Sequence, residues 1–348
     1  MQFSDDDLEA AVAAGAISAE TAAGFRVFVD RRRASPAADE ESFRLLTGFN
    51  DIFVAIAIVM VLSALGSLGG MGSPGYAGVL VALVSWGLAE FFTRKRRMAL
   101  PSIILLLAFV GGVAAMAVTL AHAFIPQITG SLQPFLFTGG ATALAALGHW
   151  RRFRVPITVA AGAFAVGATV VMAVIAFDPF TTLPLYVILA EGLALFALAL
   201  AWDMSDPLRQ TRRADVAFWL HLLAAPAIVH PLFALVGLTD WSPFAPLGRH
   251  AATPGIEAGG LAFGIYVALG VVALIVDRRA LMVSSLAYLL VAMNSLFQAT
   301  GALTLSFALS ALIVGAGLLL LSAFWTAARR EALWLAPEAL RQYLPPAS

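Results

Sequence analysis

The chain has 348 residues, of which 61% are hydrophobic and only 12% are charged. Soluble globular domains are about 45–50% apolar and about 25% charged, so this composition excludes an ordinary soluble protein and predicts a membrane protein. The 21 basic and 21 acidic residues cancel, which excludes the positive field of a nucleic-acid-binding protein, and the lack of cysteine excludes disulfides and thiolate metal ligands.

A cytoplasmic helical head is predicted for residues 1–48. Ser4 can cap a helix whose first turn holds three aspartates, Gly15 can end that helix, and Ser18 can cap a second one. Ser35-Pro36 then starts a third helix that leads into the first apolar segment.

The segment LEAAVAAGAISAETAAGF at 8–25 carries a central G-x-I-S-x-E pattern between two short helices. It resembles the heads of bacterial multi-span membrane proteins of unknown function, and it is similar to helical-pair modules that serve self-association. The resemblance covers this segment alone. It implies a helical head that favours a homo-oligomer, and it brings no catalytic residues.

Ten apolar segments follow within residues 49–325. A helix needs about 20 apolar residues to cross a hydrocarbon core about 30 Å thick, and long unbroken runs of this kind favour helices over barrel strands. The predicted spans are 49–68, 76–92, 100–121, 133–149, 155–177, 183–202, 216–238, 257–277, 280–299 and 303–325. We therefore expect an all-α polytopic protein with about ten transmembrane helices.

The basic residues indicate how these spans are oriented. With ten spans and a cytoplasmic N-terminus, 20 of the 21 lysines and arginines fall on one side, and Arg249 is the exception. Because positively charged loops stay in the cytoplasm, both termini are predicted to be cytoplasmic, in a multi-pass protein of the inner (plasma) membrane. The tail over 326–348 is predicted to be amphipathic and to lie on the membrane surface.

A carboxylate and an imidazole are the main candidates for function. Glu191 and His230 each lie about eight residues from the outer ends of the sixth and seventh spans, which is about 12 Å deep. Ionisable groups at such depth are costly and are functional candidates by default. If the two meet, they can bind and release a proton; in the alternative, each is satisfied by other groups and serves packing. Asn294 in the ninth span is a further polar candidate, as a ligand or as an inter-helix hydrogen-bonding group.

The seventh span also carries Pro226 and Pro231, each of which removes a backbone hydrogen bond and predicts a kinked or broken helix. Broken helices form the solute sites of many carriers. His221 and His230 of this span are nine residues apart and point to opposite faces, so they cannot share one ion unless the helix breaks sharply. No metal and no cofactor is expected, and His221 is expected to face the lipid headgroups.

Glycine pairs predict close helix packing. Gly111-Gly112 and Gly139-Gly140 lie in the third and fourth spans, and Gly260 and Gly264 form a G-x-x-x-G pattern in the eighth.

These features favour a secondary carrier for a small solute, which Glu191 and His230 would make proton-linked. The alternative is a non-catalytic membrane scaffold or regulator that acts through the head. An enzyme for lipid-linked substrates is the third hypothesis, and no enzyme activity is predicted, because the chain lacks H-E-x-x-H, G-x-S-x-G and phosphate-loop motifs. The expected partners are the lipid bilayer, a small solute and a second copy of the chain.

Overall fold

The computed structural model describes residues 5–25, 49–126, 131–178, 181–207, 209, 211–237, 256–299, 306–336, 338–341 and 344. Every regular element in these ranges is a helix. The chain divides into two compact units, Met1–Leu45 with Ser348, and Leu46–Ala347.

The first unit contains a pair of short helices. Helix α1 spans Asp5–Ala13, and a second helix runs over 19–25. Gly15, between them, has a φ of +69°, a left-handed conformation that glycine adopts without a Cβ clash. The Ser18 hydroxyl accepts a hydrogen bond from the Thr21 backbone N–H at 3.1 Å. The predicted end of the first helix and start of the second are thus confirmed, while Ser4 and the predicted third helix lie outside the described residues.

The second unit has a helix at each of the ten apolar segments predicted from the sequence. These helices are α3 (Phe49–Gly70), α4 (Pro74–Ala89) with its π-helical continuation η2 (Glu90–Lys95), α5 (Ala99–Phe124), α6 (Gln133–Phe153), α7 (Ile157–Phe177), α8 (Leu183–Met204), α9 (Arg212–Leu235), α10 (Ile256–Val276), α11 (Ala280–Ala299) and α12 (Ser306–Ala323). Two short helices follow, α13 (Trp325–Leu333) and α14 (Glu338–Arg341).

Seven of the described helices are long and apolar enough to cross a membrane, namely α3, α4 with η2, α5, α7, α8, α9 and α10. Helices α12 and α13 would together make an eighth span, although they meet at an angle of 79°. Helix α6 does not meet the same criterion, and the described apolar part of α11, Leu281–Asn294, is shorter than the criterion requires. The chain is therefore an all-helical membrane protein.

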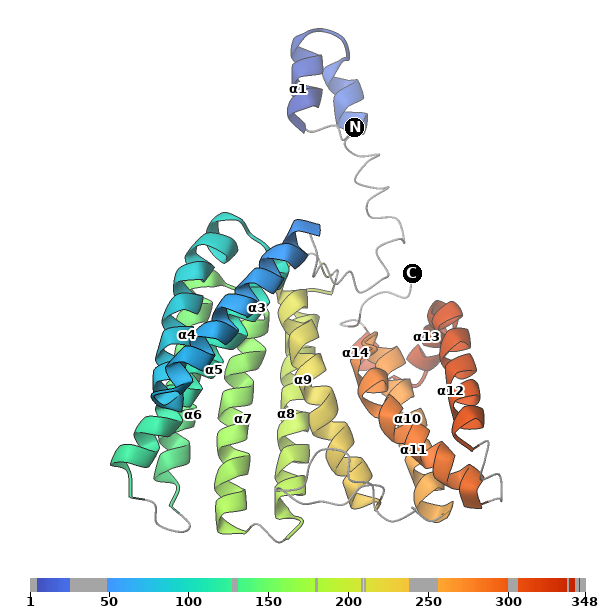
Figure 1. Cartoon of the computed structure of the whole chain (residues 1–348). Coiled ribbons are helices and arrows are strands. Elements are labelled where there is room, and N and C mark those ends of the chain that lie inside the picture. The colour runs from blue at the N-terminus through green and yellow to red at the C-terminus, as the bar shows by residue number, and fades with distance from the viewer. Residues whose placement is uncertain are drawn as a thin grey trace. The chain divides into compact units, whose positions relative to one another are not determined.

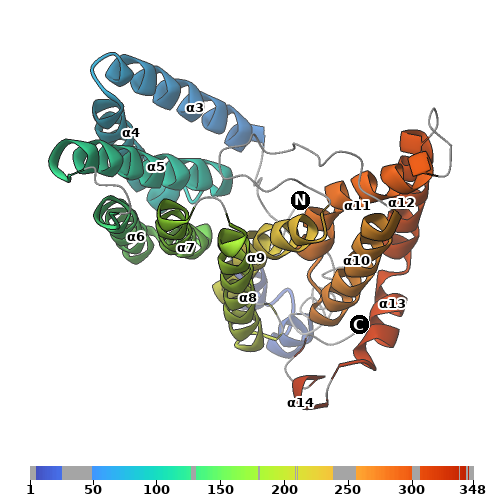
Figure 2. The same cartoon turned by 90° about the horizontal axis from the view of Figure 1, so that it is seen from below.

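Consecutive helices pack against each other as hairpins. The closest pairs are α4 with α5, α6 with α7, α8 with α9 and α10 with α11. Figure 1 shows α4 to α8 standing side by side, with α3 leaning across α4 and α5. In the end-on view of Figure 2, α9 lies between α8 and the last helices, and it contacts α7, α8 and α11. Helix α9 is also the most buried candidate span, with 56% of its apolar window inside the protein.

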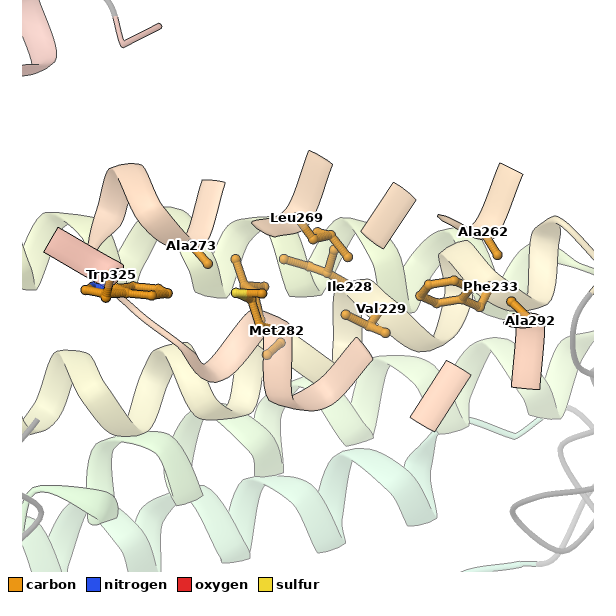
Figure 3. Packing of buried hydrophobic residues seen from close by; sticks show 11 residues of the cluster. Ile228, Val229, Phe233, Ala262, Leu269, Ala273, Met282, Ala292 and Trp325 are labelled. Atoms are coloured by element: carbon orange, nitrogen blue, oxygen red, sulfur yellow. The ribbon is translucent and has the colours of Figure 1, made fainter. Parts of the chain in front are cut away.

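A cluster of buried apolar side chains fixes α9 against α10 and α11 (Figure 3). Val229 and Phe233 of α9 are fully buried there, as is Ala262 of α10. The Tyr288 ring of α11 stacks on Phe233 with ring centroids 4.8 Å apart, and Trp325 of α13 closes one end of the cluster.

Both prolines of the seventh predicted span lie inside α9, which runs without interruption from Arg212 to Leu235. Of the two predicted forms, kinked or broken, the broken helix is therefore wrong. Neighbouring helices hold the chain in helical conformation on both sides of the prolines: Ile228 and Phe233 are buried, and Gly192 of α8 packs directly on the Ala227 backbone. Membrane helices tolerate internal proline when packing of this kind surrounds it.

Two of the predicted glycine contacts are formed. A Cβ on Gly112 of α5 would lie 2.6 Å from the Gly78 carbonyl oxygen of α4, and a Cβ on Gly139 of α6 would lie 2.8 Å from Thr169 Cβ of α7. In the described part of the chain nothing lies within 4 Å of a Cβ on Gly260 or Gly264. The prediction that this pair packs closely on another helix is therefore wrong for the described residues.

Candidate functional site

Glu191 lies on α8 with its carboxylate against α7. Gly167 of α7 leaves room for it, since a Cβ there would lie 2.9 Å from Glu191 Oε2. Oε1 of Glu191 is buried and has no hydrogen-bond partner among the described residues. The next residue, Gly192, packs on α9, where a Cβ would lie 2.7 Å from the carbonyl carbon of Ala227. Because successive helix residues point about 100° apart, this contact turns Glu191 away from α9 and toward α7.

His230 lies on α9 and faces α11. Its Nδ1 forms a hydrogen bond of 2.5 Å with the Tyr288 hydroxyl. Asn294 lies on the same helix as Tyr288, six residues further along, and is half-buried. The imidazole is thus held by the last helices of the chain rather than by α8.

The structure does not bring Glu191 and His230 together. Glu191 contacts α7, and His230 is bonded to α11, on different sides of the α8–α9 pair. The geometry matches the alternative in which each group lies beside other residues. Glu191 and His230 were predicted to be partners because they lie at the same depth in their spans. The rotation of α8 and α9 about their axes points the two side chains in different directions.

A cavity of about 580 Å³ lies between α5, α6, α7 and α9. Ligand pockets commonly have volumes of about 300–1,000 Å³. Helix α7 contributes the largest part of the wall, from Ile157 to Met172, and Gly111 of α5 and Pro226 of α9 also line it. None of the three predicted site residues is part of this wall.

The wall of the cavity is almost entirely apolar. Its hydroxyl groups belong to Thr138, Thr142 and Thr169. The Thr142 hydroxyl donates to the Thr138 carbonyl and the Thr169 hydroxyl to the Ala165 carbonyl, both at 2.7 Å. These two hydroxyls are satisfied within their own helices. The cavity therefore suits an apolar or weakly polar molecule, and it offers no carboxylate or imidazole to an ion.

A buried group of charged side chains joins α8, α9 and the turn after α10. Asp203 Oδ2 accepts hydrogen bonds from His221 Nε2 at 2.9 Å and Arg278 Nε at 3.1 Å, while Oδ1 accepts one from Arg278 Nη2 at 2.6 Å. Asp203, His221 and Arg278 are 4%, 1% and 4% exposed. The Phe196 ring packs edge-on against the imidazole, with centroids 5.1 Å apart. Two parallel Arg–carboxylate bonds make this the strong, geometrically specific form of an ion pair.

Asp277 organises a second group beside the first. Its Oδ2 accepts a hydrogen bond from Arg209 Nη1, and its Oδ1 accepts one from the Trp325 indole N–H, both at 2.9 Å. Arg329 Nε lies 3.6 Å from the same Oδ1. Arg209 also donates to the backbone carbonyls of Val276 and Asp277. These contacts tie the α8–α9 connection, the α10–α11 turn and α13 together.

His221 was expected at the lipid headgroups, and this expectation is wrong, because the side chain is almost fully buried against Asp203. Sequence reasoning did not single out Asp203, since charges at span ends usually reach water. A signal was nevertheless present. Asp203 and His221 lie near the same ends of consecutive spans.

The buried charged group of Asp203, His221 and Arg278 has a structural role, because it joins α8, α9 and the turn after α10. Asp203 and Arg278 neutralise each other, and neither they nor His221 line the cavity. Nδ1 of His221 has no hydrogen-bond partner among the described residues, and the ring lies in a packed interior. Within the described ranges, no three His, Asp or Glu side chains are grouped so that they could hold a metal ion.

No model of a protein family, no curated protein and no solved structure matches this chain.

Proposed function

We propose that this protein is a multi-pass carrier for a small, apolar or weakly polar solute, which binds in the cavity between α5, α6, α7 and α9. The cavity is the observation that carries the proposal. Three of its four helices, α5, α7 and α9, are long and apolar enough to cross a membrane. A solute held between them lies at membrane depth, where pockets between packed helices commonly bind small molecules.

The proposal includes ten spans, with both ends of the chain in the cytoplasm and the protein in the inner (plasma) membrane. The contacts of the two helices that fall short of the span criterion support this number: α6 packs against α5 and α7, and α11 against α9, α10 and α12. The distribution of 20 of 21 basic residues on one side of ten spans supports the orientation.

Glu191 is the candidate for proton linkage. Its carboxylate touches Gly167 on one face of α7, while another face of α7 forms most of the cavity wall. Binding of a proton at Glu191 would therefore act on the solute through the packing of α7 against α8. His230, bonded to Tyr288, is no longer needed for this role.

Gly111 offers a sharp test. It lines the cavity, and a Cβ there would meet nothing within 4 Å, so Gly111→Leu places a larger side chain in the cavity from an open backbone position. Gly140→Leu, in equally open space on α6 and outside the cavity wall, is the matched control. In proteoliposomes containing the full chain, we expect uptake of labelled neutral apolar compounds but not of sugars or amino acids. Gly111→Leu should slow this uptake about tenfold or more, and Gly140→Leu should not.

The carrier proposal would be contradicted if proteoliposomes with the wild-type protein took up none of these compounds and if none of the compounds raised the thermal stability of the protein. The scaffold alternative is favoured by one observation, namely that residues Met1–Leu45 belong to a compact unit of their own. It predicts that deletion of residues 1–34 abolishes function and that Gly111→Leu leaves it unchanged.

A further inference from the structure

The cavity wall restricts the chemistry of its occupant. Two of its three threonine hydroxyls already donate to carbonyls of their own helices, and most of the remaining wall is hydrocarbon. A polar group buried there would lose its hydrogen bonds to water without replacing them. The part of the occupant that enters the cavity is therefore hydrocarbon.

The cavity opens on the flank of the helices. Phe164, Leu107 and Leu222 of its wall are 61%, 51% and 37% exposed. In a membrane this flank faces the acyl chains of the bilayer, so the occupant enters from the lipid. The wall extends along α7 from Ile157 to Met172, which is about 22 Å at 1.5 Å per residue. A hydrocarbon core is about 30 Å thick. The wall therefore extends over most of the thickness of the core, and it is long enough to hold an extended hydrocarbon chain.

Arginines gather at one end of this wall. Arg151 lies in the last turn of α6 and Arg154 directly follows it, three residues before Ile157. Arg213 lies in the first turn of α9, six residues before Trp219, which also lines the cavity. Trp219 packs against the buried cluster of Leu106, Val155 and Ile157, so the two sets of arginines belong to the same end.

These three arginines are exposed. None of them forms an ion pair with another residue in the described part of the chain, although Arg154 lies over the Trp150 ring at 5.6 Å. The neighbouring Arg152 differs, because it is already paired with Glu90 at 2.7 Å.

We propose that the cavity binds the hydrocarbon chain of an anionic phospholipid whose phosphate lies beside Arg151, Arg154 and Arg213. The inference goes beyond the carrier function proposed above, because it assigns a lipid ligand to the same cavity. Guanidinium groups pair well with phosphate oxygens. A zwitterionic lipid would fit the cavity equally but would lack the net charge that the arginines select.

Quenching of tryptophan fluorescence tests this site, because Trp219 lines the cavity. The full chain is placed in phosphatidylcholine bilayers and titrated with phosphatidylglycerol that carries brominated acyl chains, which quench indoles in contact with them. We expect saturable quenching that Trp219→Phe removes. Brominated phosphatidylcholine should give no saturable component.

The variants separate the two parts of the site. Each change of Arg151, Arg154 or Arg213 to Gln should weaken phosphatidylglycerol binding about fivefold, and Arg152→Gln should not. Gly111→Leu should weaken it about tenfold or more, whereas Gly140→Leu should match the wild type. Equal binding of the two lipids, or equal behaviour of the two glycine variants, would overturn the proposal.

The two proposals fail in different ways. If phosphatidylglycerol binds as expected but neither lipid nor solute crosses the membrane, the lipid site stands and the carrier function does not. If Gly111→Leu blocks uptake of a neutral apolar compound while lipid binding is unchanged, the carrier stands and the lipid site does not.

Discussion

Asp203 compensates the buried guanidinium of Arg278 and orients the imidazole of His221 at the same time. A buried ion pair is costly to form, because both ions lose their hydration, but it is more costly to break from one side. The carboxylate makes two bonds to Arg278 and one to His221 inside a nearly closed interior. Loss of Asp203 would remove both of these carboxylate bonds from the buried guanidinium of Arg278.

We expect Asp203→Ala to lower the free energy of unfolding by about 3–5 kcal/mol. The double variant Asp203→Ala/Arg278→Met should lose less than the sum of the single variants, because it removes both charges together. Unfolding of the purified protein in detergent measures each value. Glu90→Ala, which breaks the exposed pair with Arg152, is the control and should have a much smaller effect. Equal losses of the free energy of unfolding for Asp203→Ala and Glu90→Ala would show that the buried charged group does not stabilise the fold more than an exposed ion pair does.

At the scale of helices, the ends of an element are easier to predict from the sequence than the rotation of the element about its own axis. The length of an apolar run must match the membrane, so the predicted spans differ from α3 to α12 by only a few residues at each end. Rotation depends on which small residues meet. The contact of Gly192 with Ala227 turns Glu191 toward Gly167, and His230 meets Tyr288 on a helix 58 residues later in the chain. No pattern within α8 or α9 contains this information.

Adjacent glycines on α5 test how closely two helices must approach. Gly112→Ala should lower the free energy of unfolding by about 1–3 kcal/mol, because the added Cβ would lie 2.6 Å from the Gly78 carbonyl oxygen of α4. Gly111→Ala adds the same methyl group one residue earlier, where nothing lies within 4 Å, and should not lower stability, because alanine has the higher helix propensity. Both values come from unfolding in detergent. Similar losses for the two variants would mean that the close approach of α4 and α5 at Gly112 does not decide the effect.

At the scale of the whole membrane unit, α9 connects the parts on which the proposals depend. One face contributes Pro226 to the cavity, another contributes Phe233 to the core shared with α10 and α11, and His221 binds Asp203 of α8. The sequence marked this helix by its prolines and histidines, but it suggested a break where the structure has a continuous, well-packed helix. The apolar cavity left no such signal, because its wall consists of ordinary membrane residues contributed by four separate helices.

Single cysteines can establish whether α6 crosses the membrane, because the chain has no cysteine of its own. Met71→Cys lies between α3 and α4, and Thr181→Cys lies between α7 and α8; both positions are exposed. If α4, α5, α6 and α7 all cross, an even number of spans separates the two positions, and a maleimide that cannot pass the membrane should label both from outside intact cells. Arg151→Cys, in the last turn of α6, should then be labelled only after lysis. If α6 does not cross, Met71→Cys and Thr181→Cys lie on opposite sides, and labelling of only one of them in intact cells would exclude the ten-span arrangement.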